Sequence, residues 1–414
     1  MRKKKILKII LLFLIVVSAF FAGHENPEVI IKIKNISKNI TSQIGKNQKP
    51  PENQLNKNNS VNQQKKVEKI IDANSFKFQY LNVVSFEEKT AGVIFNDSSK
   101  DYKIFTQNGY LIDKTIMRKL EMPKDFYTDQ DGGIKSVFIV DNNIYFLLSK
   151  KENDCFFASL MNFTKKIEVM RSKCIPDSEN INFAGLGGAY IFKDEELLLS
   201  IGTPTHISDI IDKLSQDKDS IFGKIISIKT EEFKTRNEKI NYNFFSIGHR
   251  NPQGLTKYKE KIFSLEHGPQ GGDELNEIIE DSNYGWPIAS YGTRYNNGKG
   301  FARSHADLGF KEPIYSFLPA VAPSSLTKCP NELQNYYNNS LCLIGLSLRE
   351  MSLLIILLNN KNSSTISVEK IKLDKRLRNF GVNKKGELFI DENGYFYFSS
   401  DTYGLFKGKF FSFR

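Results

Sequence analysis

The sequence has only four cysteines, a single tryptophan and no Cys-x-x-Cys motif. The missing motif argues against zinc sites and thioredoxin-type redox chemistry, which depend on closely spaced thiols. The cysteines form two local sets, Cys155 with Cys174 and Cys329 with Cys342. Two local disulfides are the expected arrangement in an oxidising compartment, and four free buried thiols are the alternative.

Segments with the periodicity of an amphipathic helix are also scarce, and residues 207–214 are the best short example. Short apolar or alternating runs separated by turn residues fill the chain instead. These runs include residues 143–149, 189–201, 223–228, 261–265, 340–346, 353–358 and 386–400. Asn393-Gly394 and Asp194-Glu195 stand where tight hairpin turns would join two such runs. Many short antiparallel strands predict an all-β fold, either stacked sandwiches or a propeller.

Most of the chain carries almost no net charge. The net charge is +11, but residues 1–70 contain 14 Lys/Arg and 4 Asp/Glu, so residues 71–414 carry a net charge of only +1. A nearly neutral folded part lacks the electrostatic footprint of a protein that binds phosphate backbones. We therefore expect no nucleic-acid partner.

The N-terminus has the layout of a secretion signal. Basic residues precede an apolar run over residues 6–23, so residues 1–23 predict a signal peptide cleaved after Ala19, or an uncleaved membrane anchor. Both predict a periplasmic or secreted protein. Residues 24–75 are rich in Lys, Asn and Gln and predict a disordered linker. Residues 76–414 are expected to form the folded domain.

The most informative stretch is residues 248–287, where glycine, proline, carboxylates, amides, histidine and the only tryptophan occur together. Its three blocks read GHRNPQGL (248–255), EHGPQGGDELN (266–276) and NYGWP (283–287). Loops of this composition are expected to be held rigid around a ligand. In order and spacing, the blocks closely resemble the signature of the soluble pyrroloquinoline quinone (PQQ)-dependent aldose sugar dehydrogenases, the glucose/sorbosone dehydrogenase family.

The resemblance implies a six-bladed β-propeller that oxidises aldose sugars with PQQ and Ca²⁺ and passes electrons to a separate acceptor. Arg250 and Asn251 match the family's cofactor-contacting pair. Arg376 and Arg378 match an Arg-x-Arg that reaches the cofactor, and the alternation of a strand places both on one face. Guanidinium groups suit the carboxylates of PQQ because they pair with them bidentately. Arg349 stands where the family has a lysine.

The resemblance also implies two calcium sites. Gly268 and Pro269 match backbone carbonyls that hold the calcium beside the quinone. Glu274 and Tyr284 match a structural site, through a carboxylate and a main-chain carbonyl. Oxygen ligands on rigid loops suit Ca²⁺. The residues expected only to pack these loops are His249, His267 and Trp286.

The segment that should carry the catalytic histidine departs from the family pattern. Gly185 stands at the histidine position, and Thr203 stands at the position of the carboxylate that orients it. Asp131, or Gln130 one residue earlier, stands where the family has a cofactor-contacting glutamine. General-base assistance typically contributes about 10²–10⁴-fold to the rate, so this loss matters. His206 is the tentative substitute, and a plain surface histidine is the alternative.

Two functions therefore remain open. The first is a PQQ- and calcium-dependent sugar dehydrogenase, which the retained arginines favour. The second is a catalytically impaired propeller that serves as a calcium-stabilised glycan- or protein-binding module, which the missing pair favours.

Overall fold

The structure is a computed structural model that describes residues 68–73, 76–96, 101–205, 209–234 and 239–412. These residues belong to one compact unit, Asn59–Arg414. The predicted signal segment and most of the predicted linker lie outside the described residues. Within the described part of the chain, no helix is long and apolar enough to cross a membrane.

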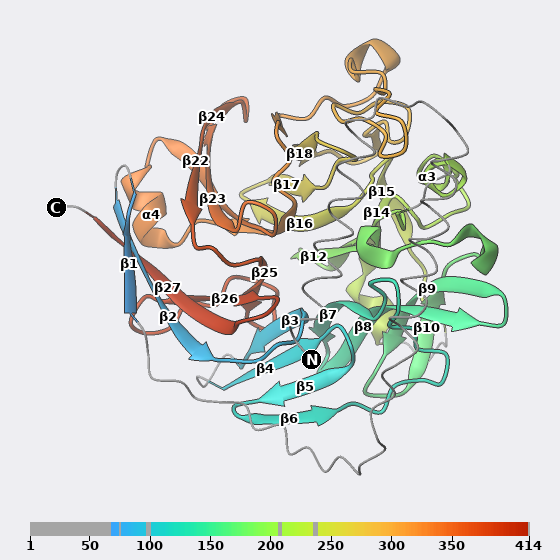
Figure 1. Cartoon of the computed structure of the whole chain (residues 1–414), viewed down its shortest axis with the longest axis horizontal. Coiled ribbons are helices and arrows are strands. Elements are labelled where there is room, and N and C mark those ends of the chain that lie inside the picture. Colours follow the sequence, from blue (N-terminus) through green and yellow to red (C-terminus); the bar gives the residue numbers. More distant parts are fainter. Residues whose placement is uncertain (1–67, 74–75, 97–100, 206–208, 235–238, 413–414) are drawn as a thin grey trace, which may run out of the picture. The chain divides into compact units, whose positions relative to one another are not determined.

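The strands pair into antiparallel sheets that follow one another around a ring (Figure 1). The first sheet consists of β3 (Thr90–Phe95), β4 (Tyr102–Thr106), β5 (Tyr110–Asp113) and β6 (Ile116–Lys119). The second consists of β7 (Ile134–Val140), β8 (Asn143–Glu152), β9 (Cys155–Asn162) and β10 (Ile167–Arg171), with the short β11 (Ile175–Pro176) paired to β9. The third consists of β12 (Gly187–Lys193), β13 (Glu196–Ile201), β14 (Lys224–Lys229) and β15 (Asn243–Ile247), with β19 (Ser282–Asn283) parallel to β15.

The remaining sheets complete the ring. The fourth consists of β16 (Pro252–Tyr258), β17 (Lys261–Glu266), β18 (Asp273–Ile278) and β20 (Tyr315–Phe317). The fifth consists of β21 (Pro323–Lys328), β22 (Ser340–Ser347), β23 (Ser352–Asn359) and β24 (Thr365–Lys372). The sixth consists of β25 (Leu377–Val382), β26 (Phe396–Ser400), β27 (Gly404–Ser412), β2 (Phe76–Val84) and β1 (Glu68–Asp72). The described residues thus form six blades, as expected for a six-bladed propeller.

The ring is closed by strands from opposite ends of the described chain. β2 pairs along its whole length with β27, so the sixth blade is built from both ends. On the inner side, β25 pairs in parallel with β3 and joins the sixth blade to the first. In Figure 1 the blue β2 accordingly lies beside the red β27. Ring closure covers the sheet faces that the first and last blades of an open stack would leave exposed.

The hydrophobic core is divided among the interfaces between neighbouring blades. The inward and outward faces of each sheet both carry apolar side chains, because both faces are covered by another blade. Leu147 and Leu199, for example, share one cluster between the second and third blades. Phe105 and Phe146 share another between the first and second. This arrangement explains why the strands contain long apolar runs as well as alternating ones.

The fold begins earlier than the sequence indicated. β1 lies inside the range predicted to be a disordered linker, because it pairs with β2 over five residues and its Ile71 packs against the core of the sixth blade. The folded part therefore starts at or before Glu68 rather than at Phe76.

The predicted turns and helix have mixed outcomes. β12 and β13 are joined at Asp194-Glu195, as predicted, and a short helix α3 (Asp209–Asp212) lies in the expected segment. The Asn393-Gly394 turn also forms, with Gly394 at a φ of 79°. The arm before that turn makes isolated bridges rather than a strand, because residues 383–387 fold into their own turn around the Asn383 side chain. A second helix, α4 (Asn331–Tyr336), was not predicted.

Both predicted disulfides are present. Cys155 is bonded to Cys174, and Cys329 is bonded to Cys342. Within the described residues no cysteine remains free. The pairing excludes the alternative of four free thiols.

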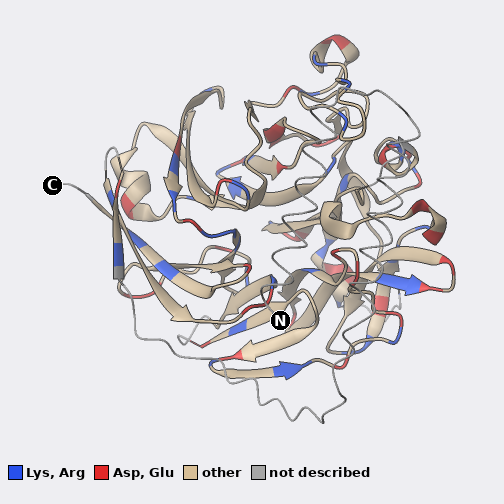
Figure 2. Cartoon of the chain, viewed as in Figure 1, with Lys and Arg blue, Asp and Glu red and all other residues tan. Residues whose placement is uncertain are grey.

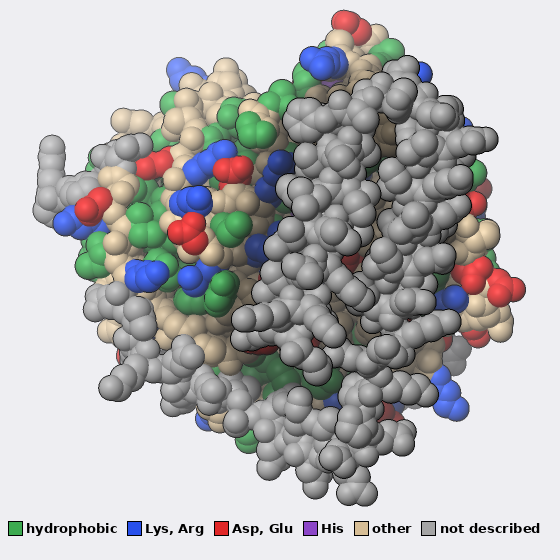
Figure 3. Space-filling model, in the orientation of Figure 1, with side chains coloured by type: hydrophobic (Ala, Val, Ile, Leu, Met, Phe, Trp, Pro, Cys, Tyr) green, Lys and Arg blue, Asp and Glu red, His purple; other side chains and the backbone are tan. Residues whose placement is uncertain are grey.

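Residues of both charge signs are distributed around the described ring. Lys and Arg residues are interspersed with Asp and Glu residues (Figure 2). On the coloured part of the face in Figure 3, basic and acidic side chains likewise alternate with hydrophobic ones. That the chain has no nucleic-acid partner stays a prediction.

Candidate functional site

The six inner strands, β3, β7, β12, β16, β21 and β25, pack side by side around the ring axis. The first residues of these strands and the loops before them enclose a cavity of about 290 Å³, here called the axial cavity. Its charged and polar lining includes Lys89, Asp131, Lys135, Arg250, Asn251, His267, Arg376 and Arg378. A second cavity of about 320 Å³ lies further along the same strands.

Arg376 and Arg378 lie on one face at the start of β25, as the sequence predicted. Both guanidinium groups donate to the carboxylate of Asp401, Arg376 through Nε at 3.2 Å and Arg378 through both Nε and a terminal nitrogen, the latter at 2.8 Å. Asp401 is almost fully buried. Burial alone would raise its pKa, but the two arginines lower it below the usual value. Asp401 therefore stays ionised and fixes both arginines at the cavity wall.

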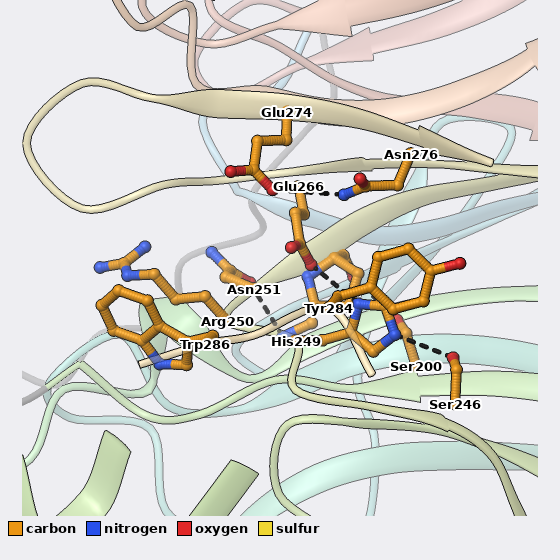
Figure 4. Close-up of polar contacts among 12 residues, drawn as sticks. Ser200, Ser246, His249, Arg250, Asn251, Glu266, Glu274, Asn276, Tyr284 and Trp286 are labelled. Atoms are coloured by element: carbon orange, nitrogen blue, oxygen red, sulfur yellow. Dashed lines mark hydrogen bonds and ion pairs between the residues drawn. The ribbon is translucent and has the colours of Figure 1, made fainter. Parts of the chain in front are cut away.

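Arg250 and Asn251 follow β15 and enter the cavity lining from the first of the three motif blocks. The Arg250 guanidinium donates to the backbone carbonyl of His267 at 3.2 Å and lies over the ring of Trp286 at 5.4 Å (Figure 4). Asn251 accepts the backbone amide of Gly187 at 3.1 Å. Trp286 thus does more than fill the core, because its ring face also positions a cation of the cavity.

The fifth predicted cofactor residue is placed differently. Arg349 is exposed, and it is the neighbouring Leu348 that lines the cavity. The structure therefore brings four of the five predicted residues together, and the role of Arg349 stays a prediction.

Three further charged residues line the cavity: Asp131 in the loop before β7, which the sequence placed at a cofactor-contacting position, and Lys89 and Lys135, which the sequence did not assign to the site. Asp131 forms an ion pair with Lys89 at 2.6 Å and accepts a hydrogen bond from Asn182 at 3.1 Å. Burial would raise the pKa of Asp131, but these partners lower it. Lys135 donates to the backbone carbonyl of Asp131. The sequence signal for Lys135 was a lysine inside a mostly apolar strand, two residues after Gly132-Gly133.

Burial lowers the pKa of Lys135 to about 7, and the nearby charges of Arg378 and Lys89 act in the same direction. The charge of Asp131 opposes this shift. Among the described residues Lys135 forms no ion pair with a carboxylate. Near neutral pH the Lys135 amine therefore gives up its proton far more readily than an ordinary lysine.

The second motif block is held by a buried carboxylate. Asp273 accepts the backbone amides of Gly268 at 2.9 Å, Val321 at 2.8 Å and Ala322 at 2.6 Å. It thereby ties the Gly268–Pro269 loop to the chain that enters the fifth blade.

Buried carboxylates gather beside this loop on neighbouring strands (Figure 4). Glu274 is 6% exposed, and its pKa is raised well above the usual value by burial and by the charge of Glu266. Its hydrogen bond from Asn276 is long, at 3.4 Å, and the amide oxygen of Asn276 has no partner. Buried charges of one sign are costly unless a cation compensates them. This donor set fits a hard cation such as Ca²⁺.

His249 packs within its loop, as the sequence predicted. The His249 ring is fully buried, is bonded to Ser246 at 2.8 Å and to Glu266 at 3.2 Å, and stacks on the ring of Tyr284. The Tyr284 hydroxyl donates to the carbonyl of Glu277 at 2.6 Å.

Within the described residues no three His, Cys, Asp or Glu side chains converge on one point. A calcium ion would therefore need backbone carbonyls among its ligands. The resemblance implies those of Gly268 and Pro269 for the site beside the quinone and that of Tyr284 for the structural site.

The sequence profile of the family described as Glucose / Sorbosone dehydrogenase matches residues 103–396, which is most of the chain. The chain belongs to this family. The match extends from β4 to β26 and so includes the three motif blocks and the Arg376–Arg378 pair.

Two curated proteins resemble about half of the chain. The uncharacterized protein slr1608 of Synechocystis sp. is 31% identical over 215 residues, which is 48% of this chain and 52% of that protein. Aldose sugar dehydrogenase YliI of Escherichia coli is 27% identical over 198 residues, 45% of this chain and 50% of that protein. The chain thus spans about half the length of these curated relatives.

Solved structures of family enzymes share the fold over nearly their whole length. The soluble aldose sugar dehydrogenase of Escherichia coli in its apo-form has a TM-score of 0.63 at 19% identity and covers 80% of this chain and 99% of its own. The PQQ-bound aldose sugar dehydrogenase of Streptomyces coelicolor has a TM-score of 0.56 at 18% identity, with 84% and 99% covered. At these identities the likeness establishes the propeller fold.

Gly185 and Thr203, the two positions at which the sequence predicts a departure from the family pattern, lie against each other. A side chain at Gly185 would place its Cβ only 2.2 Å from the carbonyl oxygen of Thr203, so the backbone has closed around the glycine. Thr203 is buried, and its hydroxyl donates to the carbonyl of Arg250 at 3.2 Å. His206, the tentative substitute base, lies outside the described residues.

Proposed function

We propose that this chain is a PQQ- and calcium-dependent oxidoreductase that acts on the CH–OH group of aldose sugars and passes the electrons to a separate acceptor. The observation that carries the proposal is the axial cavity, whose described lining contains five cationic side chains and one carboxylate. A tricarboxylate quinone needs such fixed cations. Family membership supplies the reaction class.

In the proposed complex, Arg250, Arg376 and Arg378 hold the carboxylates of PQQ, and Asn251 contributes its amide. Asp401 orients Arg376 and Arg378, and Trp286 orients Arg250, so little ordering is needed on binding. When bound, PQQ would accept the two electrons of the oxidised sugar. Arg349 is kept as a fifth contact in this proposal.

Calcium is assigned to the loop that Asp273 braces and to the buried Glu274. Support comes from the close placement of the buried carboxyls of Glu274 and Glu266, which raises the pKa of Glu274, and from the orphaned oxygen of Asn276. Gly268, Pro269 and Tyr284 would contribute backbone carbonyls. Calcium beside the quinone would act as a Lewis acid.

A location outside the cytoplasm, periplasmic or secreted, is supported by the two disulfides, because such bonds persist in oxidising compartments. The predicted leader at residues 1–23, cleaved or kept as an anchor, is the proposed route to that location.

The contact between Gly185 and Thr203 favours a second candidate function. A propeller that keeps its cofactor and calcium loops without turnover would serve as a glycan- or protein-binding module. The two candidates differ in a single observable, the reduction of bound PQQ by an aldose.

The proposed site is tested by titrating the calcium-loaded protein with PQQ. Quenching of the protein fluorescence reports the binding. We expect saturable binding that Arg378→Met weakens about 10-fold or more, because hydrogen bonds to charged groups are worth roughly 1.5–3 kcal/mol. Arg118→Met, which removes an exposed arginine of β6, is the matched control and should bind as the wild type does. Equal binding by the two variants would place PQQ elsewhere, and no saturable binding by the wild type would refute the proposal.

A further inference from the structure

Among the described cations of the axial cavity, Lys135 and Arg250 are held by backbone carbonyls, whereas the other three are paired with carboxylates. Arg376 and Arg378 are paired with Asp401, and Lys89 is paired with Asp131. Lys135 instead donates to a backbone carbonyl, that of Asp131, and pairs with no carboxylate among the described residues. An amine without a counter-ion in a cationic cavity is poorly suited to stay protonated.

The backbone brings Lys135 next to the segment that contains Gly185. Gly188 lies at the start of β12 with a φ of 107°, and a Cβ on it would lie 2.6 Å from the carbonyl oxygen of Lys135 and 3.3 Å from its Cβ. The two inner strands β7 and β12 are therefore in direct contact at the cavity wall. A base supplied from Lys135 would act at the same side of the cavity as one supplied from Gly185.

We propose that Lys135 is the general base of sugar oxidation in this chain, taking the proton of the hydroxyl group that is oxidised. This inference rests on the proposed function. The O–H bond of the anomeric hydroxyl breaks as its proton passes to the lone pair of Nζ. The C–H electron pair leaves with its hydrogen as hydride to the bound quinone, which is the oxidant. The sugar becomes a lactone, and the ammonium of Lys135 returns its proton to solvent.

The charged groups around Lys135 set its proton affinity. Arg378 on β25 and Lys89 before β3 lower the pKa, Asp131 in the loop before β7 raises it, and β12 contributes the side-chain-free Gly188. The value of about 7 belongs to the protein without PQQ, and the carboxylates of PQQ would raise it. Bases of this strength are effective near neutral pH. The other described bases of the cavity are weaker, because the pKa values of Asp131 and His267 are lowered.

The decisive comparison is between Lys135→Met and Lys135→Arg. Arginine keeps the positive charge but does not give up its proton, so both variants should lose turnover by about 10²–10⁴-fold. PQQ affinity should change by only a few-fold, and kcat/KM of the wild type should rise with pH through an inflection at or above about 7 that both variants lack. Exogenous ethylamine should restore part of the turnover of Lys135→Ala. Lys103→Met, which removes an exposed lysine of β4, is the control for charge loss.

A measurement that needs no turnover follows from the same chemistry. Because the folded pKa lies below the unfolded value of 10.5, Lys135 makes the wild type more stable as the pH rises from about 7 toward 10. The melting temperature of Lys135→Met without PQQ should therefore exceed that of the wild type most at pH 6, and the difference should shrink at pH 9.

The outcomes separate the two proposals. Lys135 is not the base if Lys135→Met or Lys135→Arg turns over as fast as the wild type. The same conclusion follows if His206→Ala abolishes turnover while Lys135→Met does not. If Lys135→Met mainly loses PQQ affinity, Lys135 binds the cofactor and the base role is wrong. If the wild type binds no PQQ at all, the proposed function itself fails, and the catalytic role fails with it.

Discussion

Asp401 shows how a single residue prepares the cavity for an anion. It is 3% exposed, it accepts hydrogen bonds from both Arg376 and Arg378, and its pKa is lowered despite burial. A carboxyl whose pKa is lower in the folded than in the unfolded protein stabilises the fold above its ordinary value of 3.8. That contribution is lost as the pH falls toward the folded pKa.

We therefore expect Asp401→Asn to lower the free energy of unfolding at pH 7 by roughly 3 kcal/mol, because two arginines lose a buried partner. Urea titrations at pH 7 and at pH 3 measure this. The difference between variant and wild type should be much smaller at pH 3, and a difference independent of pH would show that the ion pairs do not contribute as described.

Glu274 gives a prediction about calcium. Added Ca²⁺ should raise the melting temperature of the wild type, since a ligand present at 100 times its Kd stabilises the native state by about 2.7 kcal/mol. Glu274→Gln should respond much less to Ca²⁺. In the presence of a chelator it should melt at or above the wild-type temperature, because one buried negative charge is gone.

Calorimetric melting with Ca²⁺ and with a chelator measures both effects. Glu277→Gln, on the same strand but partly exposed and paired with Lys261 at 3.0 Å, is the control that should keep the calcium response. A chelator that leaves the wild-type melting temperature unchanged would remove calcium from the proposal.

At the scale of single residues, the sequence identified Arg250, Asn251, Arg376 and Arg378 because they stand in motifs of fixed spacing. It did not identify Lys135 or Asp401 as cavity groups. Their positions depend on which strands meet at the ring axis, and the pairing of Asp401 with the arginines joins residues more than 20 positions apart. No local pattern encodes such a contact.

Among the elements, the loop before β7 depends on two glycines. Gly133 has a φ of 105°, and a Cβ on it would lie 2.1 Å from the carbonyl oxygen of Gln107. The Gln107 amide in turn donates to the carbonyls of Asp131 at 2.9 Å and Gly132 at 2.5 Å. This tight turn fixes the carbonyl that receives the amine of Lys135.

Gly133→Ala should accordingly destabilise the protein more than Gly298→Ala. Both glycines have positive φ, which costs an alanine about 1–2 kcal/mol, but nothing lies within 4 Å of the Cβ position at Gly298. Crowding at Gly133 adds about 1–3 kcal/mol. Chemical denaturation of the two variants compares them directly, and equal destabilisation would mean that the loop yields without strain.

The sequence predicted strands correctly where an apolar or alternating run was bounded by turn residues. Predicted runs overlap β8, β12, β13, β17, β22 and β23. β1 was missed because its sequence is rich in charge, and its order comes from pairing with β2. The arm at residues 387–390 was overpredicted because a local turn around Asn383 competes with strand pairing.

For the whole molecule, the number of blades was not visible in the sequence, which has no strict repeat. The expected number of six came from the family resemblance, and the strands of the described residues form six blades. The pairing of β2 with β27 closes the ring. Because each blade packs on two neighbours, the ring is expected to unfold as one unit rather than blade by blade.

Two truncated proteins test this cooperativity. A chain that starts at residue 74 lacks β1, and one that starts at residue 85 lacks both β1 and β2. The first should unfold in a single transition close to that of the full chain, and the second should lose the sharp transition because the sixth blade is open. If the second melts as the first does, ring closure does not hold the molecule together.

The most direct test of the central claim is the reduction of bound PQQ by an aldose under anaerobic conditions. The calcium-loaded protein is saturated with PQQ, mixed with a panel of aldoses and followed by the absorbance of the quinone. We predict that at least one aldose converts the quinone spectrum to that of the reduced form, at a rate that Lys135→Met lowers. Tight binding of PQQ with an unchanged spectrum for every aldose would contradict the claim and identify the chain as a cofactor-retaining binding module.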